Sequence, residues 1–145
     1  MIVLMRHGEA QWPAPRDSER PLTTTGQRQV RESVQWLARQ GVEIECLLAS
    51  PLVRAQQSAE IAHHAFDCDI QTINSLQPDT DPRLAEKALQ PYSSALICFH
   101  QPLISRLVQR WTGQSVAVGT GAVFVLEGEF LAPDWLNLRA QFCPN

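Results

Sequence analysis

The sequence has few of the features that mark membrane, secreted or nucleic-acid-binding proteins. No apolar run approaches the roughly 18 residues of a membrane-spanning helix. The opening run from Met1 to Met5 reaches Arg6 too soon for the core of a signal peptide. Basic charge is not in excess, because 12 lysines and arginines stand against 15 acidic residues, for a net charge of −3. We therefore expect neither a membrane nor a nucleic acid as the main partner.

Cysteine is also scarce. The four cysteines, Cys46, Cys68, Cys98 and Cys143, show neither paired spacing nor a metal-ligand pattern. A reducing, cytoplasmic location is the default expectation, although the even count leaves a disulfide formally open. No internal repeat, low-complexity tract or linker divides the 145 residues, a length of about one domain. An apolar content of 44% is typical of a globular protein, so we expect one domain over residues 1–145.

Short apolar runs alternate with helical patterns along the chain. Buried strands are expected at 2–5, 46–49, 70–73 and 95–99, and two closing strands, compatible with an antiparallel arrangement, at 122–126 and 135–138. Apolar residues at helical spacing predict helices between 23 and 41, from 55 to 66, from 81 to 89 and from 103 to 111. This alternation predicts an α/β three-layer sandwich, in which helices flank a mostly parallel central sheet.

Reactive side chains follow three of the predicted strands. The first strand ends in Arg6 and His7, the second leads to Arg54, and the strand at 95–99 ends at His100. A single histidine or arginine at such a place is usually structural or solvated. Because the carboxyl ends of parallel strands share one edge of the sheet, where ligands bind, three such coincidences favour a functional site.

Two arginines and two histidines in one crevice favour phosphate chemistry. Guanidinium groups bind phosphate through paired hydrogen bonds, and an imidazole can attack phosphorus as a nucleophile. A metal site is less natural, because the arginines would repel a cation and no cluster of carboxylates and histidines is evident. We therefore expect no metal and no organic cofactor.

Four sequence blocks resemble the histidine phosphatase superfamily, which includes phosphoglycerate mutases and many phosphatases. In chain order they are LMRHGEA at 4–10, RPLT followed by a glycine at 20–26, SPLVRAQQS at 50–58, and HQPL at 100–103. The short chain, the DSERPLT run at 17–23 and the loop at 76–82 are most similar to the small phosphohistidine phosphatases of the SixA type. The resemblance implies a phosphoglycerate mutase-like fold.

The resemblance also implies a role for each matching residue. His7 is the expected nucleophile and forms a phosphohistidine intermediate, Arg6 and Arg54 clamp the phosphate, and His100 stabilises the transition state. Asp17 has two equally weighted candidate roles: it acts as a general acid or base, or it orients an arginine. Arg20 is a candidate phosphate contact, with a solvated loop arginine as the alternative.

The chain departs from the larger family members between the third and fourth blocks. Those proteins carry a long insertion there that covers the site and supplies an acidic group, whereas here only 55–99 intervene. We expect no large cap, an open site, and Glu86 too far along its helix to reach that site. An open site suits phosphate on a protein histidine, and the implied partners are phosphotransfer domains or phosphotransferase-system proteins. The alternatives are a small-molecule phosphomonoesterase using His7 and, less favoured, a noncatalytic phosphate-binding module.

Overall fold

A computed structural model describes residues 1–145. The strands are β1 (Ile2–Arg6), β2 (Cys46–Ala49), β3 (Ile70–Thr72), β4 (Ala95–Phe99), β5 (Val123–Glu127) and β6 (Asn137–Phe142). The α-helices are α1 (Thr24–Arg39), α2 (Val53–Phe66), α3 (Pro82–Leu89) and α4 (Leu103–Thr112). Short 3-10 helices lie at η1 (Asp17–Glu19) and η2 (Asn74–Leu76).

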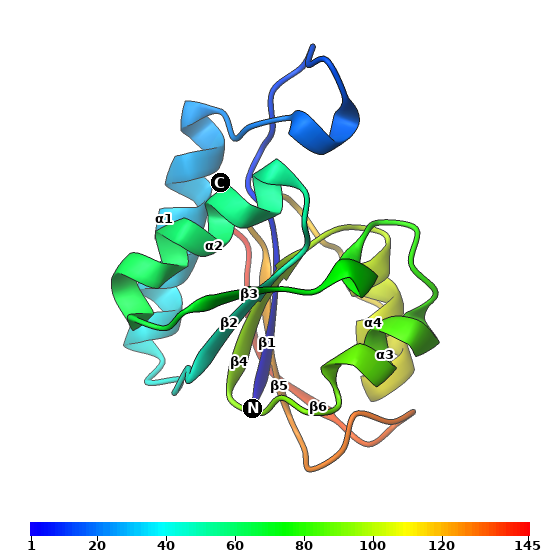
Figure 1. The fold of residues 1–145 in the computed structure, drawn as a ribbon. Helices are drawn as coiled ribbons and strands as arrows, with labels where there is room; N and C mark the ends of the chain where they lie inside the picture. Colours follow the sequence, from blue (N-terminus) through cyan, green and yellow to red (C-terminus); the bar gives the residue numbers. More distant parts are fainter.

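All the strands belong to one sheet, in the order β3-β2-β4-β1-β5-β6 (Figure 1). The pairs β3–β2, β2–β4 and β4–β1 are parallel. β5 runs antiparallel to β1, and β6 runs antiparallel to β5. The predicted mostly parallel sheet with antiparallel closing strands is therefore confirmed. The carboxyl ends of β1, β2 and β4 lie together at one edge.

Helices cover both faces of the sheet, so the predicted three layers are confirmed. α1 and α2 pack on one face, and α3 and α4 pack on the other (Figure 1). Along β1, Val3 and Met5 join the core under α1 and α2, while Ile2 and Leu4 join the opposite core. Burial on both faces explains why the sequences of β1, β2, β4 and β5 are mostly apolar. Each fully buried aliphatic side chain stabilises the fold by about 1.5–3 kcal/mol.

Two of the helices begin at residues whose side chains cap them, Thr23 and Asp81. The Thr23 hydroxyl accepts a hydrogen bond from the Gly26 amide at 2.9 Å, at the start of α1. The Asp81 carboxylate accepts from the Arg83 amide at 2.9 Å, at the start of α3. These bonds satisfy amides that have no partner within the helix. The predicted end of α1 is also confirmed, because Gly41 follows it with a φ of +69°.

The last strand differs from its predicted position. It was expected at 135–138 but spans Asn137–Phe142, and Trp135 lies before it with 59% of its surface exposed. β6 is the edge strand of the sheet, and its residues alternate between exposed and partly buried. The apolar pair at 135–136 therefore carries a stronger hydrophobic signal than the strand itself.

The segment between α2 and β4 contains β3, η2 and α3 and no large insertion. α3 contributes Ala85 and Leu89 to the core that it shares with α4, so this segment completes the sandwich. All the cysteines are free thiols. None of the helices combines the length and the apolar character needed to cross a membrane.

Candidate active site

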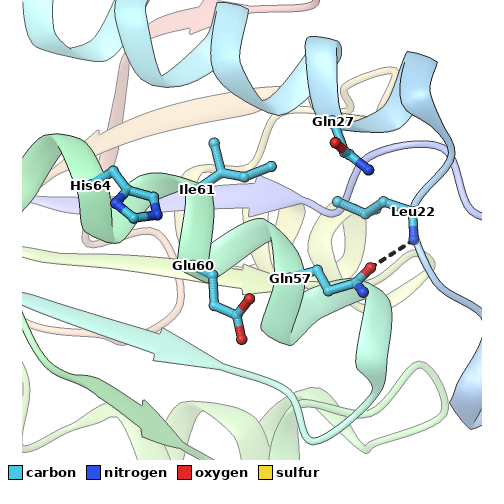
Figure 2. Close-up of a pocket in the computed structure, with 6 residues that line it drawn as sticks. All are labelled: Leu22, Gln27, Gln57, Glu60, Ile61 and His64. Carbon is cyan, nitrogen blue, oxygen red and sulfur yellow. Dashed lines mark hydrogen bonds between the residues drawn. The ribbon is translucent and has the colours of Figure 1, made fainter.

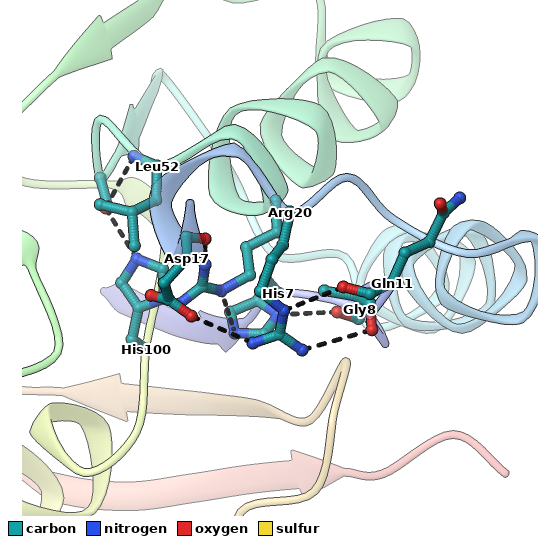
Figure 3. A network of polar contacts seen from close by, with 10 residues as sticks. His7, Gly8, Gln11, Asp17, Arg20, Leu52 and His100 are labelled. Atoms are coloured by element: carbon teal, nitrogen blue, oxygen red, sulfur yellow. Dashed lines mark hydrogen bonds and ion pairs between the residues drawn. The ribbon is translucent and has the colours of Figure 1, made fainter. Parts of the chain in front are cut away.

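A pocket of about 390 Å³ opens at the carboxyl edge of the sheet. All six site residues proposed from the sequence line it: Arg6, His7, Asp17, Arg20, Arg54 and His100. The other lining residues are Glu9, Ala10, Pro78, Gln101 and Thr120. Figure 3 shows the polar contacts that link His7, Asp17 and Arg20, and a separate chain of contacts between His100 and Leu52. The parallel strands thus bring together residues that are distant in the sequence.

The hydrogen bonds of His7 determine which of its ring nitrogens carries the proton. Its Nδ1 lies 2.6 Å from the carbonyl oxygen of Gly8, which can only accept. Nδ1 therefore carries the proton, and the lone pair of the neutral ring is on Nε2. The Arg54 Nε–H donates to that lone pair at 3.3 Å. His7 thus presents a neutral, nucleophilic nitrogen inside the pocket.

The surroundings of His7 keep it neutral at physiological pH. The residue is only 6% exposed. Burial is the main cause that lowers its pKa to about 4, against the opposing effect of the Gly8 carbonyl, and the nearby charges of Arg54, Arg6 and Arg20 lower it further. A neutral imidazole is the form that can attack an electrophile.

Asp17 holds two arginines of the pocket from the 3-10 helix η1. Arg54, only 4% exposed, donates from Nη1 to the Asp17 carbonyl at 2.7 Å and from Nη2 to its carboxylate at 3.2 Å. Arg20 donates to the same carboxylate at 3.3 Å. Burial favours the neutral acid, but Arg54 and Arg20 outweigh it and keep the pKa of Asp17 below its usual range. Asp17 is therefore an ionised acceptor that fixes the direction of Arg54.

Arg20 lies at the rim, held over the loop that follows β1. It donates to the backbone carbonyls of Gln11 and Ala10 at 3.0 and 3.3 Å. Its guanidinium also stacks on the exposed ring of Trp12, 3.9 Å from the ring centroid. This arginine is a positioned pocket residue, in contrast to the freely solvated alternative.

The second histidine lies beside the first, with ring centroids 5.1 Å apart. His100 is 1% exposed, and its Nε2 lies 2.7 Å from the hydroxyl of Ser50. Burial is the main cause that lowers its pKa to about 2, and the neighbouring His7, Arg54 and Arg6 add to the effect. Both histidines of the pocket are therefore neutral near pH 7.

Two buried nitrogens of the pocket residues have no hydrogen-bond partner in the protein. They are Nε of Arg6 and Nδ1 of His100. Arg6 is otherwise anchored, because its Nη1 donates to the Val118 carbonyl at 2.9 Å. Buried polar groups are normally paired, so unpaired nitrogens in a cationic pocket suit an anionic ligand that supplies several acceptor oxygens.

Gly8 and Gly26 allow the backbone after His7 to pass close to the start of α1. A Cβ atom on Gly8 would collide with the carbonyl oxygen of Gly26, at the start of α1. The Gly8 amide also donates to the hydroxyl of Ser58, on α2, at 3.3 Å. Gly8 thus brings the end of β1 close to both helices, which fixes the backbone that orients the His7 ring.

Sequence reasoning gave no functional role to three groups around this pocket: the Ser50 hydroxyl, the Val118 carbonyl and Thr120. Ser50 follows β2, and it reaches His100 because β2 and β4 are neighbours in the sheet. The other two precede β5, which lies antiparallel to β1, so its beginning meets the end of β1. Ser50 opens the SPLVRAQQS block, but the block alone does not pair it with His100, and no motif marks the other two groups. The order of the strands is the signal that would have found these contacts.

Other features that could form a site lie outside this pocket. A hollow of about 220 Å³ lies between α1 and α2, and none of its lining residues is an arginine. Figure 2 shows these residues, among which Gln57 accepts a hydrogen bond from the Leu22 amide. Glu86 lies on α3, outside the pocket, and its carboxylate binds Arg110 and Trp111 of α4. The expectation that Glu86 does not reach the site is therefore confirmed. No group of three or more histidine, cysteine or acidic side chains is arranged to hold a metal ion.

Comparisons with known proteins give consistent results. Residues 2–91 match the model of the histidine phosphatase superfamily, branch 1. The chain is 38% identical over 117 residues to the phosphohistidine phosphatase SixA of Escherichia coli strain K12, covering 74% of this chain and 71% of SixA. It is also 39% identical over 89 residues to a probable phosphoglycerate mutase, GpmB, of Enterobacter sp. strain 638, covering 59% of this chain and 37% of the mutase.

A solved structure agrees with these sequence matches. The chain resembles the structure of the protein histidine phosphatase SixA complexed with tungstate, with a TM-score of 0.88 and 30% identity. The match covers 99% of this chain and 96% of that one. The similarity therefore extends over the sheet, the helices on both of its faces and the pocket edge.

Proposed function

The chain belongs to the histidine phosphatase superfamily, and we propose that it is a phosphohistidine phosphatase that works through a covalent phosphate on His7. The observation that carries the proposal is the set of groups in the polar pocket. A nucleophilic lone pair on His7, three arginines and two unpartnered nitrogens meet there. This set matches what transfer of an anionic phosphoryl group requires.

In the first step, the lone pair on His7 Nε2 attacks phosphorus, and the bond between phosphorus and the substrate nitrogen breaks. The substrate imidazole, protonated on its other ring nitrogen, departs as neutral imidazole. In the second step, water attacks phosphorus, the bond to His7 breaks, and inorganic phosphate leaves with the protons of the water. The Gly8 carbonyl holds Nδ1–H at 2.6 Å and directs Nε2 to phosphorus in both steps.

The cations of the pocket bind the phosphoryl oxygens and stabilise the charge that develops on them. Arg6 and Arg54 are the proposed clamp, Arg20 contacts the phosphate from the rim, and His100 donates a hydrogen bond from within. For Asp17 we favour the orienting role, because its carboxylate already accepts from both Arg54 and Arg20. Removing one such donor typically costs about 100- to 1,000-fold in turnover. The tungstate in the related SixA structure, a tetrahedral oxyanion, supports a phosphoryl site.

The nature of the leaving group supports phosphohistidine as the substrate. Imidazole, whose conjugate acid has a pKa of about 6.5, departs without the strong general acid that an alkoxide needs. The carboxylate of Asp17 is ionised and engaged with arginines, and Glu86 lies outside the pocket. Neither of these two carboxyl groups is therefore free in the pocket to protonate an ester oxygen.

The pocket walls support a phosphate that is carried by a protein. Only one of the 11 lining residues is hydrophobic, whereas sites for small organic ligands are mostly apolar. The proposed partners are phosphotransfer domains or phosphotransferase-system proteins that carry phosphohistidine. We propose the cytoplasm as the compartment, which free thiols suit, and residues 1–145 as one catalytic domain.

Single-turnover dephosphorylation tests this function. A histidine-phosphorylated transfer domain is mixed with excess protein in the presence of a chelator, beside p-nitrophenyl phosphate and a phosphoserine peptide. We expect rapid loss of phosphate from histidine, much slower loss from the esters, and acid-labile phosphate on the protein during turnover. His7→Ala should abolish all three signals, and His64→Ala serves as the matched control, because that histidine lies outside the pocket.

Three results would contradict parts of the proposal. Comparable rates on phosphoserine and phosphohistidine would overturn the specificity and favour a phosphomonoesterase with the same nucleophile. Full activity in His7→Ala would overturn the mechanism. Binding of the phosphoprotein without any turnover would indicate a noncatalytic phosphate-binding module.

A further inference from the structure

Ser50 is a buried hydroxyl that contacts the second histidine and has no role in the mechanism above. It follows β2 directly and is 0% exposed. Its Oγ lies 2.7 Å from Nε2 of His100, which follows the neighbouring strand β4. The Leu52 amide, just before α2, lies 3.2 Å from the same oxygen. Figure 3 shows this chain of contacts from Leu52 to His100.

The directions of these hydrogen bonds follow from which groups can donate. The Leu52 amide can only donate, so the Ser50 oxygen accepts from it. The hydroxyl proton of Ser50 then has one acceptor in the protein, Nε2 of His100. In this arrangement His100 carries its own proton on Nδ1, the ring nitrogen that has no partner in the protein.

The opposite tautomer leaves more groups unsatisfied. With the proton on Nε2, His100 would donate to Ser50, and the hydroxyl proton of Ser50 would be buried without an acceptor. The unpartnered Nδ1 would then present a lone pair beside a pocket lined by Arg6, Arg20 and Arg54. A lone pair there repels the oxygens of an anion, whereas an N–H group binds them. Buried polar groups without partners cost about 1–3 kcal/mol each, which favours the first tautomer.

We infer that Ser50 is a positioning residue that holds His100 with its proton on Nδ1, so that this N–H donates to a phosphoryl oxygen in the pocket. The inference rests on the proposed function for its consequence in turnover, but the tautomer itself is independent of which substrate is used. A purely structural role, such as fixing the turn before α2 through Leu52, would affect stability and leave the His100 proton where it is.

The tautomer is measured by NMR on protein labelled with 15N in its imidazole rings. Long-range proton–nitrogen correlations at pH 7.5 distinguish a protonated ring nitrogen from one with a lone pair, and His100→Gln identifies the signals of His100. We expect the wild-type protein to carry the His100 proton on Nδ1. In Ser50→Ala a substantial fraction should shift to Nε2, and Ser50→Thr should restore the wild-type pattern. Ser50→Cys, with a weak S–H donor, replaces Ser50→Ala if that variant does not fold.

Ser33→Ala is the matched control. Ser33 is equally buried, and its hydroxyl donates to the Gly121 carbonyl at 2.6 Å without contacting His100. This variant should lose stability and keep the His100 tautomer. Two results would overturn the inference: a His100 proton on Nε2 in the wild-type protein, or an unchanged proton on Nδ1 in Ser50→Ala.

Binding and turnover separate this inference from the proposed function. The affinity for inorganic phosphate and the turnover of a phosphohistidine protein should both fall in Ser50→Ala. The expected loss of turnover is about 10- to 100-fold, as for other groups that fix a histidine tautomer, and Ser50→Thr should recover most of it. A wild-type protein that shows the expected tautomer without hydrolysing phosphohistidine would contradict the proposed function alone. Wild-type activity with an unchanged tautomer in Ser50→Ala would contradict the role of Ser50 alone.

Discussion

Acidification should destabilise this protein through its two pocket histidines before most carboxylates become protonated. In the unfolded chain a histidine takes up a proton below pH about 6.5. In the folded protein, burial lowers the pKa of His7 to about 4 and that of His100 to about 2. Between these values the unfolded chain binds more protons than the folded one, so the free energy of unfolding falls as the pH falls.

The size of the effect follows from the pH interval. Each pH unit below about 6.5 costs up to about 1.36 kcal/mol for each histidine that stays neutral when folded. At pH 5 this amounts to about 2 kcal/mol for His7 and the same for His100, or about 4 kcal/mol together. The loss due to His7 stops growing near pH 4, where the folded protein also binds that proton. For a domain with about 5–15 kcal/mol of stability, this is a large change.

Urea denaturation at pH 7.5, 6 and 5 measures the effect in the wild-type protein and in His7→Gln and His100→Gln. Glutamine does not titrate, so each single variant should lose about 2 kcal/mol less than the wild-type protein between pH 7.5 and pH 5. The loss for each variant is measured relative to its own free energy of unfolding at pH 7.5. The destabilisation caused by the lost hydrogen bonds therefore cancels from the comparison. Equal losses in the variants and the wild-type protein would refute the conclusion that burial keeps these histidines neutral.

Three substitutions test other parts of the structure. Gly8→Ala should lower the free energy of unfolding by about 1–3 kcal/mol or more, because the new Cβ would collide with the Gly26 carbonyl. A wild-type melting temperature would contradict this close approach of the two backbone segments. Arg54→Lys should reduce phosphohistidine turnover about 100-fold, since lysine cannot reproduce the planar guanidinium that binds His7 and Asp17 together. Wild-type kinetics in this variant would contradict the role given to these paired contacts. Glu86→Gln should cost about 1–3 kcal/mol in urea denaturation without changing turnover, and a large kinetic defect would place Glu86 in the reaction.

The fold could be predicted from the sequence because its central strands are buried on both faces. A run such as Ala95–Phe99, buried at every position, has no polar interruption and stands out from its surroundings. β6 shows the limit of this signal. Polar and apolar residues alternate along this edge strand, as is typical of a strand with one exposed face, so it has no continuous apolar run like those of the central strands. The predicted strand began instead at the neighbouring apolar residues Trp135 and Leu136. Trp135 lies outside the sheet and packs against Phe130 on the surface, with ring centroids 5.4 Å apart.

The site could be predicted only as far as its residues stand at strand ends or inside sequence motifs. His7 and His100 follow β1 and β4, so sheet geometry alone brings them to one edge. The pairing of Asp17 with Arg54 depends on the conformation of the loop after β1, which has no periodic pattern. The contact of Ser50 with His100 depends on β2 and β4 being neighbours, a fact about strand order that no local motif contains. Short-range patterns therefore identified the reactive groups, while the groups that orient them required the tertiary structure.

One arrangement of charge explains both how the pocket binds and how its nucleophile is kept ready. The arginines attract an anion, and the same positive charges oppose protonation of His7 and His100. Burying Arg54 to 4% exposure costs solvation energy, and Asp17 offsets part of that cost with a carboxylate and a carbonyl. The carboxylate accepts from Nη2 and the carbonyl from Nη1, which leaves Nε to His7. When a phosphoryl group enters, it meets donors whose directions are already set, so little reorganisation is needed as charge develops on its oxygens.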